Sequence, residues 1–221
     1  MKFLVEDRHG RHEMTVTPKN LVMVGFSGRD IEKAMEHVEE LERLQVQCPA
    51  IIPALYSCDP ALAVQTGEIT VHGKRTSGEA EYLILKHGGK YYIGLGSDHT
   101  DRDIEMDDIA ASKQACPKPC AGVLWDYYEI KDHLSELRLA STVVVGGAEI
   151  EYQDGVAGDI LPPIALLNKV SKAVDLEDCL IFSGTVPLLR GYKYGERFSC
   201  RLVDDRLGRE IDLSYTVNVQ E

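Results

Sequence analysis

Residues 79–98 read EAEYLILKHGGKYYIGLGSD and predict a β-hairpin. Two apolar runs, at 82–85 and 91–95, flank the dipeptide Gly88-Gly89, which is typical of a tight turn between antiparallel strands. Because the two strands would pair across this turn, the residues before the first run and after the second are expected to meet at the open end of the hairpin.

Three carboxylates stand at that open end. Glu79 and Glu81 are two positions apart, and side chains at that spacing leave a strand from the same face. Asp98 follows the second run, so the hairpin can bring all three acids to one place. Taken alone, each acidic motif is more typical of a solvated strand face or a polar loop. Together they have the composition of an oxygen-ligand site for a hard divalent cation such as Mg²⁺ or Mn²⁺.

The chain has 221 residues and a net charge of −12, and its hydrophobic fraction of 44% is sufficient for one sizeable core. The acidic balance argues against a nucleic-acid partner and against an anionic membrane surface, because both require a basic protein surface. The sequence shows neither a signal peptide nor an apolar run approaching the ~20 residues of a membrane helix. Its 6 cysteines lack close-paired zinc spacing and are interpreted as reduced thiols, so we expect a cytoplasmic protein.

An N-terminal segment, residues 1–60, is expected to precede a catalytic domain at residues 61–221. Within the segment, Asp30 caps a predicted helix whose apolar residues repeat every three or four positions until Cys48-Pro49 ends it. The stretch 49–60 is interpreted as a rigid, proline-containing connector. The rest of the chain is predicted to be rich in short strands. The expected strands cover 2–6, 13–17, 21–26, 82–86, 91–96, 136–145, 179–183, 198–202 and 211–217, and a longer helix covers 160–174.

Further residues are candidates for chemistry beside a cation. Lys113 would lose basicity there and could donate a proton, although a lone lysine is usually a surface charge. His37 and Glu40 stand one turn apart on the predicted helix, where the carboxylate could orient the imidazole; an exposed pair without function is the simpler interpretation. Gly184 and Thr185 follow an apolar run and could present a backbone N–H and a hydroxyl to an anion, or form a plain turn.

The order of these motifs resembles that of the fumarylacetoacetate hydrolase superfamily. The closest similarity is to a bacterial branch known only as a domain of unknown function, in which the run at 96–102 recurs. The motifs, in chain order, are His37-Val38-Glu39-Glu40, Glu79-Ala80-Glu81, Asp98 to Asp103, Lys113 with Cys116-Pro117, and Ser183 to Pro187.

This resemblance implies an α+β, β-rich fold: a mixed β-sandwich roll with a lid helix in its N-terminal segment, usually assembled as a homodimer. It also implies that Glu79, Glu81 and Asp98 bind Mg²⁺ or Mn²⁺. Members of the superfamily act on small oxo-carboxylates. The reaction expected here is hydrolysis of a C–C bond in an acylpyruvate or a β-diketone through a metal-stabilised enolate.

The same resemblance implies roles for the remaining motifs. Lys113 would lie near the negative charge that develops on the enolate. His37, oriented by Glu40, would deprotonate the attacking water once the helix closes as a lid. A carboxylate of the substrate, or of a neighbouring loop, would be held by Arg102 and Thr185, with Gly184 allowing close approach of the backbone.

Two alternatives belong to other functional classes. A decarboxylase, lyase or tautomerase would use the same site for a 2-oxo acid without attack by water. A non-catalytic metabolite-binding protein would keep the fold and the cation; it would need neither the His37–Glu40 pair nor Lys113, so the presence of these residues argues against it.

Overall fold

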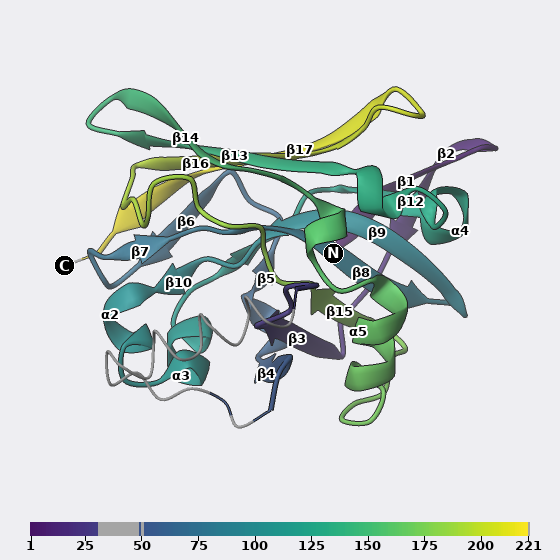
Figure 1. Ribbon diagram of the computed structural model, residues 1–221, viewed down its shortest axis with the longest axis horizontal. Helices are drawn as coiled ribbons and strands as arrows, with labels where there is room; N and C mark the ends of the chain where they lie inside the picture. The colour runs from purple at the N-terminus through teal and green to yellow at the C-terminus, as the bar shows by residue number, and fades with distance from the viewer. Residues whose placement is uncertain (31–48, 50, 221) are drawn as a thin grey trace.

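Two β-sheets, packed one on the other, carry most of the fold (Figure 1). The structure is a computed structural model that describes residues 1–30, 49 and 51–220. The larger sheet has 8 strands and mixes parallel with antiparallel pairs. Its strands, in sheet order, are β2 (Gly10–Thr15), β1 (Lys2–Asp7), β12 (Val123–Asp126), β9 (Lys90–Ser97), β8 (Ala80–His87), β15 (Cys179–Phe182), β3 (Asn20–Gly25) and β4 (Ala54–Cys58).

The second sheet has 5 strands and forms the upper layer in Figure 1. In sheet order they are β14 (Ala148–Val156), β13 (Arg138–Val145), β16 (Arg197–Asp204), β17 (Arg209–Val219) and β6 (Glu68–Val71). Two short ladders complete the β structure. They pair β10 (Thr100–Asp101) with β7 (Thr76–Ser77), and β11 (Lys118–Pro119) with β5 (Ala63–Val64).

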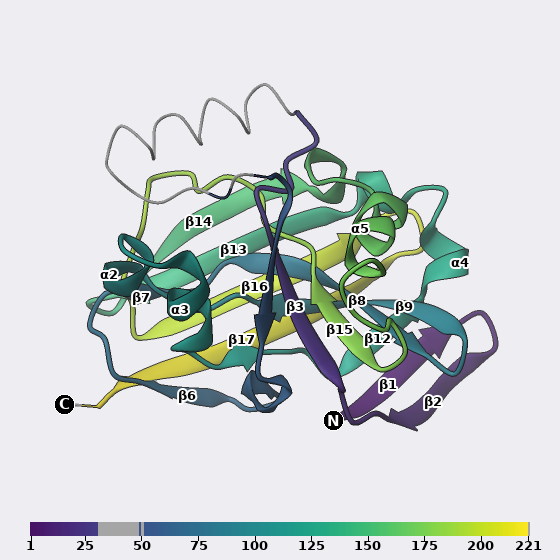
Figure 2. The same cartoon turned by 90° about the horizontal axis from the view of Figure 1, so that it is seen from below.

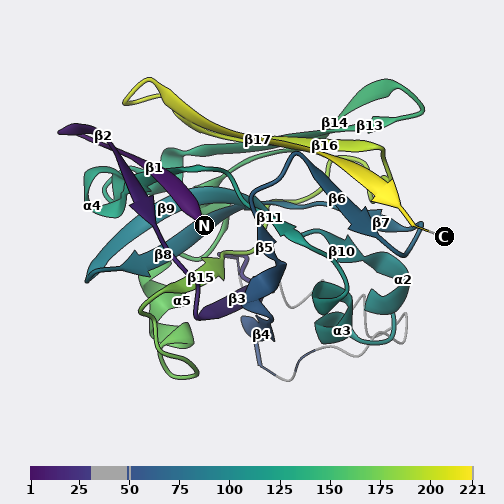
Figure 3. The same cartoon turned by 180° about the vertical axis from the view of Figure 1, so that it is seen from behind.

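Short helices lie at the two ends of the sheets. Figures 1 and 2 place α2 (Arg102–Glu105) and α3 (Ile109–Gln114) together at one end, and α4 (Tyr127–Ile130) and α5 (Pro163–Val170) at the other. Figure 3 shows the β1–β2 hairpin at the end opposite β6 and β7. Single turns of 3₁₀-helix are η1 (Pro60–Leu62), η2 (Leu134–Glu136) and η3 (Ala157–Asp159). Among the described residues, no helix combines the length and the apolar character that crossing a membrane requires.

Strand β8 is buried on both faces, which explains its continuous apolar run. Tyr82 and Ile84 point into the main core, which lies between the two sheets and includes Tyr152 and Phe198 of the smaller sheet. The alternate residues of β8 join a second cluster on the other face of the larger sheet. The hairpin is therefore held rigidly from both sides, and so is the acidic site at its open end.

The predicted hairpin is confirmed. Strands β8 and β9 pair antiparallel across Gly88-Gly89, with Ala80 opposite Ser97 and Glu81 opposite Gly96. The β-rich α+β class is also confirmed, and strands form near each of the positions expected for them.

Several details differ from the prediction. The expected helix at 160–174 is limited to α5, because two prolines, Pro162 and Pro163, set its start. The proposed rigid connector at 49–60 contains strand β4, and β6, β12 and β14 were not predicted. The predicted lid helix falls at 31–48, outside the described residues.

The N-terminal segment contributes four strands to the larger sheet. Strand β1 pairs with β12, and β3 lies between β15 and β4. The boundary at residue 60 stays a prediction, and strands on both sides of it share this sheet. Strands β3 and β4 are neighbours, with Gly25 paired to Ala54, so the chain leaves the sheet after β3 and returns to it beside the same point.

Candidate metal centre

Glu79, Glu81 and Asp98 meet at the open end of the β8–β9 hairpin. Each offers a carboxylate oxygen, and these oxygens lie within 4.8 Å of one another. The backbone N–H of Asp98 donates to the carbonyl of Glu79 at 3.0 Å, which fixes the two chain segments side by side. Glu81 and Asp98 are buried, whereas Glu79 is half-buried, so the cluster faces solvent on the Glu79 side.

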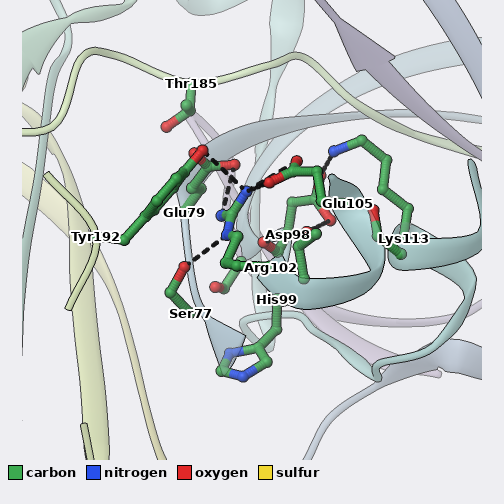
Figure 4. Close-up of polar contacts among 12 residues, drawn as sticks. Ser77, Glu79, Asp98, His99, Arg102, Glu105, Lys113, Thr185 and Tyr192 are labelled. Carbon is green, nitrogen blue, oxygen red and sulfur yellow. Dashed lines mark hydrogen bonds and ion pairs between the residues drawn. The ribbon is translucent and has the colours of Figure 1, made fainter. Parts of the chain in front are cut away.

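Two lysines hold the Asp98 carboxylate. Lys113, on α3, donates from Nζ to Oδ2, and Figure 4 shows its side chain reaching toward Asp98. Lys118, on β11, lies with Nζ 3.1 Å from Oδ1. Burial by itself would raise the pKa of Asp98, but the two ammonium groups outweigh it and lower that pKa well below its ordinary value. Burial would likewise lower the pKa of Lys113, but Asp98 and the two glutamates raise it, so the loss of basicity expected from the sequence is not seen among these protein groups.

The two glutamates are less well compensated. Burial, followed by the charge of Asp98, raises the pKa of Glu81 well above its ordinary value. The contact that the structure gives its carboxylate is the backbone N–H of Gly184, at 2.8 Å from Oε2. Burial also raises the pKa of Glu79, although Arg102 opposes this. Both carboxylates therefore lie where an added positive charge would be stabilising.

Arg102 is buried between two carboxylates (Figure 4). Its Nη1 donates to both oxygens of Glu105 at 3.0 and 2.8 Å, and its Nε donates to Ser77 Oγ at 2.8 Å. Nη2 lies 3.2 Å from Glu79 Oε2 but has no hydrogen-bond partner within the described residues. The ring of Tyr192 covers one face, with its centroid 4.2 Å from Cζ. Most of this guanidinium is thus engaged with the protein, and it orients Glu79.

Gly184 and Thr185 lie on the loop after β15. Gly184 has φ +88°, and a Cβ there would come within 1.9 Å of Ser27 Oγ, so only glycine lets this N–H reach Glu81. Thr185 Oγ1 donates to the carbonyl of Ala80 at 2.6 Å and accepts from Gln153 Nε2 at 2.7 Å. The threonine hydroxyl is thereby committed to fastening the loop to β8.

His37 and Glu40, the predicted base and its orienting carboxylate, lie outside the described residues. The other predicted site residues are all at or beside the acidic cluster.

Sequence reasoning missed several polar residues that complete the site. They are Ser77, Glu105, Lys118 and Tyr192, which contact the predicted ligands or Arg102. Lys118 stands between two prolines in the stretch Cys116-Pro-Lys-Pro-Cys120, and lysines are rarely buried, so the sequence carried no signal that would have placed it in the site.

Behind the cluster, His99 joins the two sheets. Its Nδ1 lies 2.9 Å from Tyr215 Oη of β17, and its Nε2 lies 2.9 Å from Thr76 Oγ1 of β7. Burial, followed by the nearby charges of Lys118 and Arg102, lowers the pKa of His99 to about 3. The imidazole is therefore neutral at ordinary pH.

The donor set fits a hard divalent cation. All three candidate ligands are carboxylates, which suit Mg²⁺ or Mn²⁺ better than the nitrogen and sulfur donors of zinc sites. The raised pKa values of Glu79 and Glu81 point the same way, because they mark two acids whose surroundings lack sufficient positive charge.

A family profile described as a protein of unknown function, DUF2848, matches residues 24–215, which include every residue of the site. The chain belongs to the DUF2848 family. No curated protein matches it in sequence.

Solved structures place the DUF2848 chain in the fold of fumarylacetoacetate hydrolase proteins, as the motif order predicted. A yeast protein of the fumarylacetoacetate hydrolase family superposes with a TM-score of 0.66 at 14% identity, covering 92% of this chain and 94% of its own. A putative fumarylpyruvate hydrolase from Burkholderia cenocepacia gives 0.64 at 16% identity, covering 100% and 96%. A 2-keto-3-deoxyarabinonate dehydratase gives 0.66 at 17% identity, covering 96% and 77%.

Proposed function

We propose that this protein is a divalent-metal-dependent hydrolase that cleaves a C–C bond in a small oxo-carboxylate of the acylpyruvate or β-diketone type. The observation that carries the proposal is the cluster of Glu79, Glu81 and Asp98 with a lysine on Asp98. The names of neighbours with the same fold, a putative fumarylpyruvate hydrolase and a fumarylacetoacetate hydrolase family protein, support the substrate class.

Glu79, Glu81 and Asp98 would hold Mg²⁺ or Mn²⁺, which supplies a Lewis acid for the negative charge that develops on an oxo group. Lys113 adds a second positive group from the α3 side. Its ammonium bonds Asp98 and keeps two further protons for a neighbouring acceptor. In the proposal it stabilises the enolate and returns a proton to carbon after the bond has broken.

The remaining residues shape the site and bind the substrate. Arg102 holds Glu79 in place, because its buried Nη2 lies 3.2 Å from Glu79 Oε2. For the proposed contact with a substrate carboxylate, Glu79 would have to turn from Nη2 toward the cation. Gly184 and Thr185 keep the loop after β15 against β8, so that the Gly184 N–H stays on Glu81. His37, oriented by Glu40, is proposed as the base that activates water; both lie outside the described residues.

A lyase is the second candidate, because a dehydratase shares this fold. Hydrolysis adds a water oxygen to one product, whereas decarboxylation, dehydration and tautomerisation do not. Turnover in ¹⁸O-labelled water therefore separates the candidates once a substrate is found. Two further parts of the proposal, a homodimer and a cytoplasmic location, are checked by light scattering and by cell fractionation.

The first prediction tests the metal site and the reaction together. A screen of acylpyruvates, β-diketones and 2-oxo acids should find a substrate whose turnover requires Mg²⁺ or Mn²⁺. Glu81→Gln keeps the shape of the side chain but removes its charge, so Mn²⁺ affinity measured by calorimetry should fall about 100-fold or more.

Glu151→Gln is the matched control. Among the described residues, Glu151 is exposed on β14 and belongs to neither group of side chains that could hold a cation. Its loss should leave Mn²⁺ affinity unchanged. Equal affinities for wild type and Glu81→Gln would rule out the assigned ligands.

A further inference from the structure

Lys118 is a fully buried cation that the proposed reaction does not use. It is 0% exposed, and its Nζ contacts two acceptors, the carbonyl of His99 at 2.5 Å and Asp98 Oδ1 at 3.1 Å. The chain reaches this position through β11, which pairs in parallel with β5. A charged group so deeply buried costs free energy unless opposite charge offsets it, so its position beside Asp98 calls for an explanation.

Lys118 changes the charge balance of the whole site. The site contains four carboxylates, which belong to the three candidate ligands and to Glu105. Three cationic side chains lie beside them: Arg102, Lys113 and Lys118. With all four carboxylates ionised, as they would be around a bound cation, these side chains together carry about one unit of negative charge. A divalent cation reverses that sign and leaves about one unit of positive charge in a largely buried place.

Asp98 is the ligand most affected. Thr100 Oγ1 also lies 3.2 Å from its Oδ1, so one oxygen has two protein partners and the other has Lys113. A cation that binds Asp98 must approach both ammonium groups at short range. Their repulsion weakens its binding, whereas an anion bound beside the cation relieves that repulsion.

We propose that Lys118 is a positioning residue that makes the divalent cation and a carboxylate ligand bind together: each binds weakly alone, and each strengthens the other. This inference rests on the proposed metal site and narrows its substrate to an anion that contacts the cation. Coupling between the two ligands is reciprocal, so the cation raises the affinity for the carboxylate by the same factor.

The coupling can be measured on the wild-type protein without a known substrate. Mn²⁺ binding is followed by electron paramagnetic resonance of free Mn²⁺, with and without oxalate as the probe anion, and corrected for Mn²⁺–oxalate complexes in solution. Oxalate should tighten Mn²⁺ binding by about tenfold or more, which lies within the usual range of such couplings. Equal affinity with and without oxalate overturns the inference and leaves the metal site standing. No Mn²⁺ binding under either condition overturns the metal site itself, and the inference with it.

Two variants assign the coupling to Lys118. Lys118→Met removes the charge and keeps the chain length, so Mn²⁺ alone should bind about tenfold tighter and the effect of oxalate should fall below about threefold. Lys118→Gln also removes the charge but keeps a donor for the carbonyl of His99, and it replaces the first variant if that one unfolds. If Lys118 had only a structural role, its replacement would not tighten Mn²⁺ binding.

Lys131→Met is the control, because Lys131 is exposed and pairs with its neighbour Asp132. It should behave as wild type in both measurements. Weaker Mn²⁺ binding in a folded Lys118 variant, or an undiminished oxalate effect, assigns Lys118 a purely structural role and overturns the proposal.

Discussion

Gly184 couples the loop after β15 to the acidic cluster through a single N–H. Its φ of +88° suits glycine, and the space where a Cβ would stand already holds Ser27 Oγ and, at 2.9 Å, the carbonyl of Val24. A side chain at this position would have to push the loop away from β3. The Gly184 N–H would then leave Glu81, whose carboxylate depends on it.

Gly184→Ala should therefore lower the free energy of unfolding by about 3 kcal/mol, since backbone strain and steric overlap add. It should also weaken Mn²⁺ binding. Gly191→Ala is the matched control, because Gly191 has φ +65° and no atom lies within 4 Å of the place where its Cβ would stand, so strain alone should cost about 1 kcal/mol. Urea denaturation gives both values, and equal losses would contradict the steric argument.

The candidate ligands could be predicted from the sequence because their meeting depends on local pairing. A two-glycine turn fixes the β8–β9 register, and that register places Glu81 near Asp98. Lys118 could not be placed in the same way. Its contact with Asp98 depends on the pairing of β11 with β5, more than fifty residues earlier in the chain, and no local pattern encodes that pairing.

Helix α3 is the element that delivers Lys113. It is 6 residues long, too short to be stable by itself, and its first turn is capped by Asp108, whose Oδ1 accepts from Ala111 N at 2.9 Å. Helix α4, at the other end of the molecule, is capped similarly by Asp126, which accepts from Tyr128 N at 2.8 Å.

Asp108→Ala and Asp126→Ala should each cost about 1 kcal/mol of stability, the usual value of an N-cap. Asp108→Ala should also lower turnover and alter Mn²⁺ affinity, because α3 carries Lys113. Asp126→Ala should do neither, because α4 carries no residue of the site. The comparison uses thermal unfolding for stability and calorimetry for the metal. An equal effect of the two variants on Mn²⁺ would mean that α3 does not position Lys113.

Elements were missed where sequence patterns are weak. Strand β14 contains several charged residues and a glycine, and its burial alternates only in part, so its apolar signal is small. Strand β4 follows a proline and reads as a connector until its pairing with β3 is known. The apolar strands β8, β9 and β15 gave a clear signal because they are buried on both faces.

The order of the strands could not be predicted from the sequence. Strand β1 pairs with β12, and β3 pairs with β15, so each contact joins parts of the chain more than a hundred residues apart. Such pairings are decided by how whole faces pack, and a single sequence carries no local record of them. The resemblance of the motifs to a known superfamily supplied the fold class instead.

The two-sheet arrangement makes stability depend on pH through His99, which joins the sheets while uncharged. An unfolded histidine takes up a proton near pH 6.5, whereas the folded one does so only near pH 3. The unfolded state therefore binds more protons between these values. The contribution of His99 to stability is complete above about pH 6.5 and is lost as the pH falls toward 3.

The variant His99→Gln keeps a donor and an acceptor for Tyr215 and Thr76 but cannot take up a proton. Between pH 6.5 and 5, the free energy of unfolding of the wild type should therefore fall more steeply than that of the variant, by up to about 1.4 kcal/mol per pH unit. Urea denaturation at several pH values measures the difference. His72→Gln, at an exposed position, is the control. Parallel pH profiles for wild type and His99→Gln would show that His99 does not link the sheets in its neutral form.

The pairing of Gly25 with Ala54 has a consequence for how this fold can diversify. The chain that follows Gly25 returns to the same rung of the larger sheet at Ala54. Residues 27–29 are hydrogen-bonded to residues 159–161, so only beyond residue 30 can its length and sequence change without moving a strand. The carboxylates lie on a different hairpin, and their link to this part of the chain runs through Ser27, which packs against Gly184 before residue 30. Related proteins could therefore differ in the sequence and length of the proposed lid while they keep the same cation site.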